Sequence, residues 1–227
     1  IVNICIDRGL VVGSTKEMFK DTGYNKSCSR KHEFLDASSM KQLYAFWERD
    51  EAKDENGKEL FLPREKRAVF RDLALFLFMY LGDGHNLADT LRMTYDEWYS
   101  STRGKQFRFY RHKTRDRNED ASEVIFPITP ELKKIMDKYA NEPKLGRRLF
   151  PIMSQFITAK QELGVIQRYN KYIRKHMAKV AKLLDMEQEP TATWARHSFA
   201  TNLNNSGMVP YKYISDSMGH SSSNDIT

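Results

Sequence analysis

Nine consecutive apolar residues, from Leu73 to Leu81, constrain the fold of this 227-residue chain more than any other feature. They end a stretch that follows Pro63, and proline fits the first turn of a helix. A helix that is apolar on every side must be covered by other elements, and nine residues are too few to span a bilayer. The sequence therefore predicts a central buried helix over residues 64–81.

Several shorter patterns predict the elements around this helix. Asp36 is a good N-cap, and Leu35 and Met40 have the spacing of a hydrophobic staple, which indicates a helix over residues 37–49. Residues 105–113 and 124–128 alternate between apolar and polar positions, as the strands of a β-hairpin do. Further helices are predicted near residues 86–93, from Thr129-Pro130 onward, and over 158–184, 193–206 and 210–218.

Composition and charge narrow the classes of protein to which this chain can belong. The chain has 37 Lys and Arg against 30 Asp and Glu, a net charge of +7 and a pI near 9.3, which favours a polyanionic partner. Cys5 and Cys28 form neither a zinc-ribbon pair nor a disulfide framework, so a reducing compartment is expected. Residues 1–9 lack the pattern of a signal peptide and read as the end of a preceding helix. Residues 10–33 then read as a linker, and residues 34–227 as the main domain.

Two motifs near the end of the chain are the most specific signal. The first reads Arg196-His197-Ser198-Phe199-Ala200-Thr201, and the second reads Met218-Gly219-His220-Ser221-Ser222. Together they resemble the second catalytic box of tyrosine recombinases, the phage-integrase family, which reads H-x-x-R-H-[ST]-x-[AG]-T and then L-G-H-S-S. The resemblance extends over about residues 34–227.

The resemblance implies an α+β fold, predominantly helical with a small antiparallel β-sheet, and a site-specific recombinase or integrase of a bacterial mobile element. Such enzymes cleave and rejoin DNA through a 3′-phosphotyrosine intermediate and need no cofactor and no metal. The implied partner is double-stranded DNA, bound by a homotetramer in the synaptic complex. No membrane contact is expected, and the implied location is the bacterial cytoplasm, with association to the nucleoid on DNA.

Three residues match catalytic positions of the family. Arg196 matches the second arginine, whose guanidinium fork suits the oxygens of a scissile phosphate. His220 matches the histidine that hydrogen-bonds this phosphate. Lys113, in Arg111-His112-Lys113-Thr114, resembles the hairpin lysine that protonates the leaving oxygen.

Two positions depart from the family pattern. Aligning Asp89 with the glutamate of the first box puts Asn86 in the slot of the first arginine, similar to a variant box of Bacteroides-type mobile-element integrases. Thr193 occupies the histidine slot of H-x-x-R, and threonine carries no charge. Another basic group would have to supply the missing donor, and His85 and Arg92 are the adjacent candidates.

The nucleophilic tyrosine of the family lies nine residues after the L-G-H histidine, which corresponds to position 229. The 227-residue chain is therefore expected to bind duplex DNA without forming a covalent adduct. Tyr211 and Tyr213 precede His220, against the family order, and are predicted to be packing residues.

Two basic segments predict a DNA-binding surface, since one-signed charged faces suit contact with phosphates. One is the hairpin and the other is one face of the long helix over residues 158–184. The predicted phosphate-contacting residues are Arg103, Lys105, Arg108, Arg111 and Arg115 in the hairpin, and Arg168, Lys171, Lys175 and Lys179 on the helix.

Two alternatives remain open. The first is a degenerate, non-catalytic DNA-binding relative, because Asn86 and Thr193 lack the expected charges. The second is an enzyme similar to type IB topoisomerases, which relaxes DNA without choosing a site.

Overall fold

A computed structural model of the chain describes residues 33–53, 56–111 and 123–219. The chain divides into two units, Ile1–His32 and Glu33–Thr227, and every described residue belongs to the second. The predicted domain end and linker at residues 1–33 therefore lie, except for Glu33, outside the described residues. The predicted start of the main domain at residue 34 falls next to the boundary between the two units.

The described elements are mainly helical. They are α3 (Ala37–Arg49), α4 (Pro63–Leu81), α5 (Leu87–Arg92), α6 (Glu97–Ser101), β1 (Gln106–Tyr110), β2 (Glu123–Pro127), α8 (Pro130–Tyr139), α9 (Ala159–Leu183), α10 (Ala192–Ser206) and α11 (Tyr211–Ser217). This confirms the coarse prediction of a predominantly helical fold with a small antiparallel sheet. The short helix α6, capped by the Asp96 side chain on the Tyr99 amide, was not predicted.

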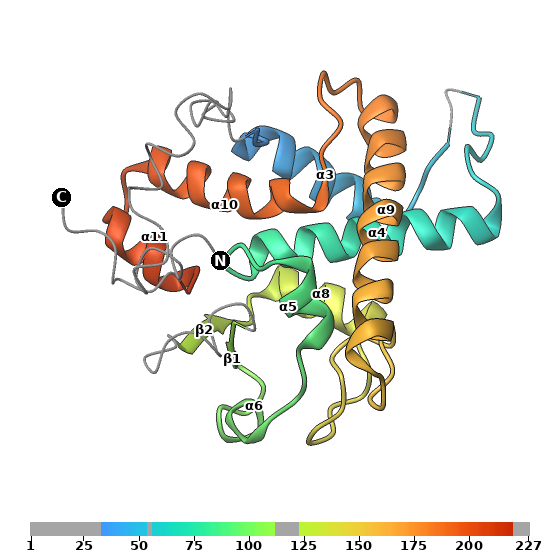
Figure 1. The fold of residues 1–227 in the computed structure, drawn as a ribbon. Helices are drawn as coiled ribbons and strands as arrows, with labels where there is room; N and C mark the ends of the chain where they lie inside the picture. The colour runs from blue at the N-terminus through green and yellow to red at the C-terminus, as the bar shows by residue number, and fades with distance from the viewer. Residues whose placement is uncertain (1–32, 54–55, 112–122, 220–227) are drawn as a thin grey trace, which may run out of the picture. The chain divides into compact units, whose positions relative to one another are not determined.

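Helix α4 is the centre of the domain, as its apolar run predicts. It packs against α3, α8, α9 and α10, and α9 crosses it steeply (Figure 1). Its residues from Leu73 to Met79 are all essentially inaccessible to solvent. Burying one large apolar side chain stabilises a fold by about 1.5–3 kcal/mol, so this helix anchors the core.

The surrounding helices begin where their capping residues predict. The Asp36 carboxylate accepts a hydrogen bond from the Ser39 amide at the start of α3, and Thr129 caps α8 in the same way. Thr158 and Gln161 form a reciprocal capping box at the start of α9. These caps place the helix starts within one residue of their predicted positions.

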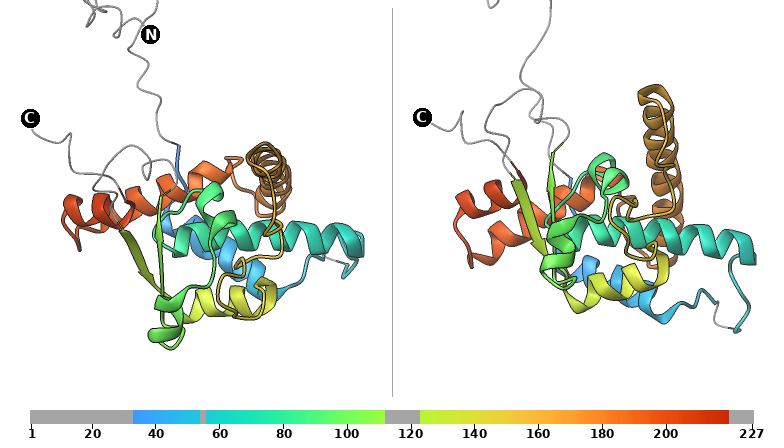
Figure 2. Two further views of the ribbon diagram at one scale, coloured as in Figure 1. Left: turned by 60° about the horizontal axis from the view of Figure 1, so that its bottom comes forward. Right: turned by 90° about the horizontal axis from the view of Figure 1, so that it is seen from below.

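The sheet consists of β1 and β2, paired antiparallel with Phe107 opposite Phe126. Both phenylalanines are fully buried, while Tyr110 and Ile125 are exposed, so the alternation predicted from the sequence is present. The strand pair lies beside α11, close to one end of α4 (Figure 2). Residues 112–122, which connect the two strands, lie outside the described residues.

Polar contacts also join elements that are far apart in the sequence. Asp72 on α4 is fully buried, and its carboxylate lies 2.6 Å from Nδ1 of His176 on α9 and 2.8 Å from Arg71. Ser198 on α10 is equally buried and accepts a hydrogen bond from the Leu35 amide at 2.8 Å. The serine of the Arg196-His197-Ser198 motif therefore has a structural role, holding the chain before α3 against α10.

Within the described residues, none of the helices combines the length and the apolar character needed to cross a membrane.

Candidate functional site

Arg196 lies on α10 at the point where three distant segments meet. Its Nη1 donates a hydrogen bond to the Gly84 carbonyl at 2.7 Å, and its Nη2 donates one to the Met218 carbonyl at 3.0 Å. Gly84 belongs to the turn after α4, and Met218 follows α11. The guanidinium is therefore held by main-chain oxygens on two sides. These neutral partners fix its orientation without compensating its positive charge.

The turn Gly82-Asp83-Gly84 reaches Arg196 because Gly84 has no side chain. Its φ of +71° lies in the left-handed region, and a Cβ there would lie 2.9 Å from the Phe199 ring on α10. Glycine satisfies both requirements at once. The close approach of this turn to α10 brings the Gly84 carbonyl onto the Arg196 guanidinium.

Arg111 is the second guanidinium at this place. It directly follows β1 and is buried, and its Nη1 donates a hydrogen bond to the Gly219 carbonyl at 3.1 Å. Its Nε lies 3.9 Å from the Asp89 carboxylate on α5. The sequence predicts Arg111 as a DNA-binding residue of the hairpin, but its local pattern does not connect Arg111 with Arg196. The alternation of side chains along the strand does indicate that Arg111 points inward, because Phe107, Phe109 and Arg111 share one face of the strand.

Gly219 makes the position of Arg111 possible. Its φ is +66°, and a Cβ added to it would lie 2.7 Å from both Cδ of Arg111 and Cγ2 of Val124. Real Cβ atoms do not come this close to other heavy atoms. Any larger residue at position 219 would therefore push the Arg111 side chain away from its present place.

We call Arg111, Arg196 and Asp89 the arginine cluster. Burial and the proximity of the two arginines determine the electrostatics of this cluster. Burial, and to a smaller extent the nearby Arg111 charge, lower the pKa of Arg196 to about 10, while Asp89 acts in the opposite direction. Arg196 still remains charged at neutral pH. Asp89 also lines an open pocket of about 500 Å³, next to Arg92, Arg108 and Arg148.

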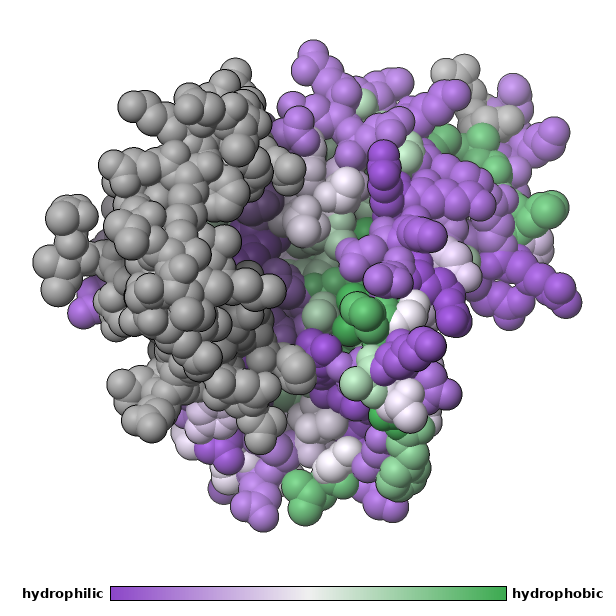
Figure 3. Space-filling view, viewed as in Figure 1, coloured by the Kyte–Doolittle hydropathy of each residue, from purple (hydrophilic) through white to green (hydrophobic). Residues whose placement is uncertain are grey.

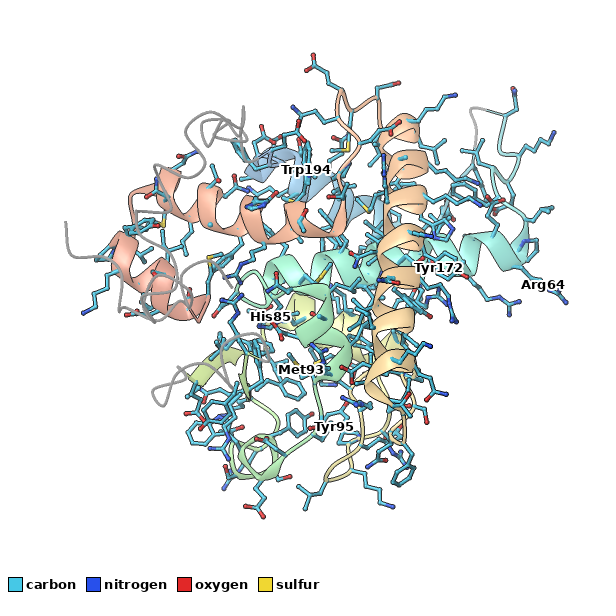
Figure 4. All side chains as sticks on the ribbon, viewed as in Figure 1. Arg64, His85, Met93, Tyr95, Tyr172 and Trp194 are labelled. Atoms are coloured by element: carbon cyan, nitrogen blue, oxygen red, sulfur yellow. The ribbon has the colours of Figure 1, made fainter. Side chains whose placement is uncertain are left out.

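His85 is not suited to replace a missing cation. Its ring is buried against Phe78, Phe109 and Phe126, in the position labelled in Figure 4. Within the described part of the chain, neither ring nitrogen has a hydrogen-bond partner. Burial and the charge of Arg196 lower the pKa of His85 to about 3, so the imidazole is neutral at physiological pH.

Asp83 and His85 predict opposite pH dependences of stability. Burial raises the pKa of Asp83 from 3.8 to about 6, so its charge costs stability above pH 6 and this cost disappears as the pH falls toward 4. His85 has its pKa lowered from 6.5 to about 3, so the unfolded state alone gains a proton below pH 6.5. Its contribution is therefore lost as the pH falls. Between pH 4 and 6 the two effects oppose each other.

Single substitutions should separate the two effects. With Asp83→Asn, the free energy of unfolding should fall on acidification by up to about 1 kcal/mol per pH unit more than in the natural chain. With His85→Leu it should fall less, or rise. Urea denaturation at several pH values between 4 and 7.5 measures both slopes. If both variants kept the slope of the natural chain, the pKa shifts of these two residues would be wrong.

The other first-box candidates are engaged elsewhere. Arg92 forms an ion pair with Glu162 of α9, with its Nε 2.6 Å from the carboxylate oxygen. Asn86 is the N-cap residue of α5, and its Nδ2 lies 3.5 Å from the Asp89 carboxylate. Asn86 thus lies next to the arginine cluster through Asp89. Arg92 is committed to α9.

Thr193, in the histidine slot, is exposed in the first turn of α10. Its hydroxyl lies 3.0 Å from the Thr191 hydroxyl.

Lys113, Arg115 and His220 fall outside the described residues, so their predicted roles stay predictions. His197 is half-buried.

The basic residues of the hairpin differ in how available their charges are for contact with phosphate. Arg103 and Lys105 are exposed, and Arg103 has a positive φ of 55° in the turn after α6. Arg108 forms ion pairs with Asp96 at 2.9 Å and Glu123 at 3.3 Å. Its charge is therefore partly compensated inside the protein, which makes it a weaker candidate for phosphate contact.

Helix α9 presents most of its predicted basic face to solvent. Arg168, Lys171 and Lys175 are exposed, while Ile166, Ile173 and Met177 pack into the core. Figure 3 shows largely hydrophilic residues along the side of the molecule where α9 lies. Lys179 differs, because it is half-buried and forms an ion pair with Glu65 of α4.

The prediction that Tyr211 and Tyr213 are packing residues is wrong. They are 68% and 56% exposed on α11. The side chain that α11 buries is Ile214, because a helix of two turns at the edge of the domain turns only one face inward.

Comparisons with known proteins add no assignment. No protein-family model matches the sequence, and no curated protein matches it. Among residues 33–53, 56–111 and 123–219, no three His, Cys, Asp or Glu side chains gather as the ligands of a metal ion would. The assignment of a function therefore rests on the arginine cluster, the segments that form it and the basic surface of α9.

Proposed function

We propose that this chain is the catalytic domain of a tyrosine recombinase, which cleaves and rejoins duplex DNA by transesterification at a phosphate. The observation that supports this most is the meeting of three segments at Arg196. These are the turn at Gly84, helix α10 and the Met218-Gly219 segment, joined by hydrogen bonds of 2.7 and 3.0 Å. They carry the two sequence boxes that resemble this family.

The chemistry requires a preorganised positive charge at the phosphate. The transition state spreads negative charge over the equatorial oxygens, and a guanidinium held in place stabilises that charge without having to reorganise. Arg196 meets this requirement, because carbonyl oxygens hold it and it stays charged. In this proposal His220 donates a hydrogen bond to the same phosphate, and Lys113 protonates the leaving oxygen.

The exposed basic residues of α9 support a DNA-binding role for the same domain. Arg168, Lys171 and Lys175 form a one-signed group on the solvent side of a helix whose other face is in the core. Neutralising phosphates with such side chains releases counterions. Contact with the DNA backbone outside the cleavage site would give affinity without reading the sequence.

Binding of the chain to duplex DNA should weaken steeply with salt. With about six phosphate contacts, the logarithm of the association constant should fall with the logarithm of salt concentration with a slope of roughly −5. Replacing Arg168, Lys171 and Lys175 together with Ala should reduce the magnitude of this slope by about 2–3. Fluorescence anisotropy of a labelled duplex at several salt concentrations measures the slope.

The matched control replaces Lys41, Arg49 and Lys144 with Ala, which removes the same charge from other exposed positions. This variant should keep the slope of the natural chain. Equal slopes for both triple variants would mean that α9 does not face the DNA. Lys179→Ala should have a smaller effect than Lys175→Ala, because Glu65 already compensates the Lys179 charge.

Covalent capture tests the reaction itself. The natural protein is incubated with a pool of nicked duplexes of random sequence. Denaturation-resistant protein–DNA adducts are then isolated, and their DNA is sequenced. Adducts sharing one sequence support a site-specific recombinase, and adducts without a shared sequence, together with relaxation of supercoiled plasmid, indicate a topoisomerase-like enzyme. Binding without any adduct would indicate a non-catalytic DNA-binding protein.

A further inference from the structure

Asn202 lies on α10, directly after the first of the two sequence motifs. Its side-chain amide donates hydrogen bonds to two segments that are far apart in the sequence, to the Leu35 carbonyl at 3.0 Å and to the Tyr80 hydroxyl at 3.2 Å. We infer that Asn202 is a positioning residue, which holds Arg196 in its orientation without contacting the phosphate. The effect on cleavage rests on the proposed function, whereas the orientation of Arg196 can be measured without DNA.

The contact with Leu35 gives Asn202 a fixed anchor. The Leu35 amide donates to the buried Ser198 hydroxyl at 2.8 Å, and the Leu35 carbonyl accepts from Asn202, so α10 binds both main-chain polar groups of one residue. Ser198 and Asn202 are four positions apart and therefore lie on the same face of the helix. The Leu35 side chain is itself part of the core. The Asn202 amide is therefore held in place where it meets Tyr80.

Tyr80 and Phe199 connect this anchor to the turn that contains Gly84. Tyr80 is the penultimate residue of α4, and its ring lies edge-on to the Phe199 ring with the centroids 6.5 Å apart. A Cβ on Gly84 would lie 2.9 Å from the Phe199 ring, so this ring is in direct contact with the turn. The Gly84 carbonyl then accepts the 2.7 Å hydrogen bond from Arg196. The contacts of Asn202 therefore extend through two aromatic rings to a carbonyl that holds Arg196.

The three α10 residues in this series of contacts are spaced three positions apart. Residues at this spacing are neighbours on a helix surface, so Arg196, Phe199 and Asn202 follow one row along α10. They contact the turn after α4 and the last turn of α4 itself. A shift of α10 would change all three contacts together. Because a displacement of about 1 Å at a reacting group can slow a reaction strongly, a side chain that fixes α10 against the end of α4 affects the reaction from a distance.

The orientation of Arg196 is measured by NMR on the protein without DNA. Rotation of the guanidinium exchanges its two Nη groups, and this rotation is slowed while separate acceptors hold them. The Arg196 resonances are assigned from the Arg196→Lys variant. In Asn202→Ala the rotation should become faster than in the natural chain, because the Gly84 carbonyl is held less firmly. Tyr80→Phe, which removes the hydroxyl and keeps the ring, should act in the same direction.

Asn141→Ala is the matched control for the loss of an amide. Asn141 is also half-buried, and its side-chain amide donates to the Arg148 carbonyl at 2.9 Å, outside the segments that hold Arg196. Its replacement removes a comparable hydrogen bond from the domain. The rotation of the Arg196 guanidinium in this variant should equal that of the natural chain.

Cleavage supplies the second measurement. At saturating DNA the single-turnover rate of Asn202→Ala should fall about tenfold. Its Kd for duplex DNA should stay that of the natural chain, because no phosphate contact is lost. A residue with a merely structural role would lower the rate and the DNA affinity together, through a smaller folded fraction. Tyr80→Phe added to Asn202→Ala should cause no further loss, since both changes remove the same hydrogen bond.

The outcomes separate this inference from the proposed function. If the Arg196 rotation in Asn202→Ala and Tyr80→Phe equals that of the natural chain, Asn202 does not position Arg196, and the proposed function is unaffected. If the rotation changes but the natural protein does not cleave DNA, the positioning role holds and the proposed function fails. Parallel losses of rate and DNA affinity, or additive losses in the double variant, would contradict the positioning role. If Asn202→Ala does not fold, Tyr80→Phe decides, since its ring contact remains.

Discussion

Replacing Arg196 with Ala should reduce DNA cleavage about a hundredfold, because it removes a preorganised donor at the phosphate; such a loss is typically about 3 kcal/mol of transition-state stabilisation. The structure gives a reason to expect an effect of this size. Arg196 is held by the Gly84 and Met218 carbonyls, so an alanine at this position removes a donor whose orientation is fixed. The quantity to measure is the single-turnover rate of adduct formation on the captured sequence.

Arg49→Ala serves as the control, since Arg49 is exposed on α3 and far in the sequence from every segment of the cluster. It should cleave at the rate of the natural chain. Arg196→Lys should recover only a small part of the activity, because an ammonium keeps the charge but cannot donate as a planar fork. Cleavage by Arg196→Ala at nearly the natural rate would remove the basis of the proposed function.

Replacing Asp72 with Ala should lower the free energy of unfolding by about 3–5 kcal/mol, as happens when one partner of a buried charged pair is removed. Asp72 is inaccessible to solvent and lies 2.6 Å from His176 and 2.8 Å from Arg71. Its removal would leave the imidazole of His176 without its carboxylate at the interface between α4 and α9. Urea denaturation followed by far-UV circular dichroism measures the loss.

Asp137→Ala is the matched control, because Asp137 forms an exposed pair with Lys133 one helical turn away. Such surface pairs contribute at most about 1 kcal/mol. Asp72→Leu combined with His176→Leu should recover much of the stability, since apolar packing often replaces a buried pair without loss. A small effect of Asp72→Ala would mean that water or a rearranged Arg71 compensates at this interface.

The helical framework could be predicted because its signals are local. The apolar run from Leu73 to Leu81, the caps at Asp36 and Thr129 and the alternation of the two strands each depend on residues within a few positions of one another. These patterns reflect the periods of helix and strand, which any fold must obey. The helix boundaries consequently agree with the structure within one or two residues.

The arrangement of the candidate site depended on tertiary structure. The alternation of β1 placed Arg111 on the inward face, but only the packing of α11 beside β2 brings the Gly219 carbonyl to its guanidinium. In the same way, packing neutralises His85 by burial and pairs Lys179 with Glu65, neither of which the local sequence indicates.

The sequence by itself thus determined most helix boundaries and the buried faces of α4 and the two strands, but it indicated neither helix α6 nor the exposure of Tyr211 and Tyr213. Tertiary structure decided which charges meet: Arg71 and Asp72 with His176, Arg92 with Glu162, and Arg111 with Arg196. The physical reason is that the two kinds of interaction act over different distances along the chain. Periodicity and capping act over one or two turns, whereas burial and electrostatic contact depend on residues that only folding brings together.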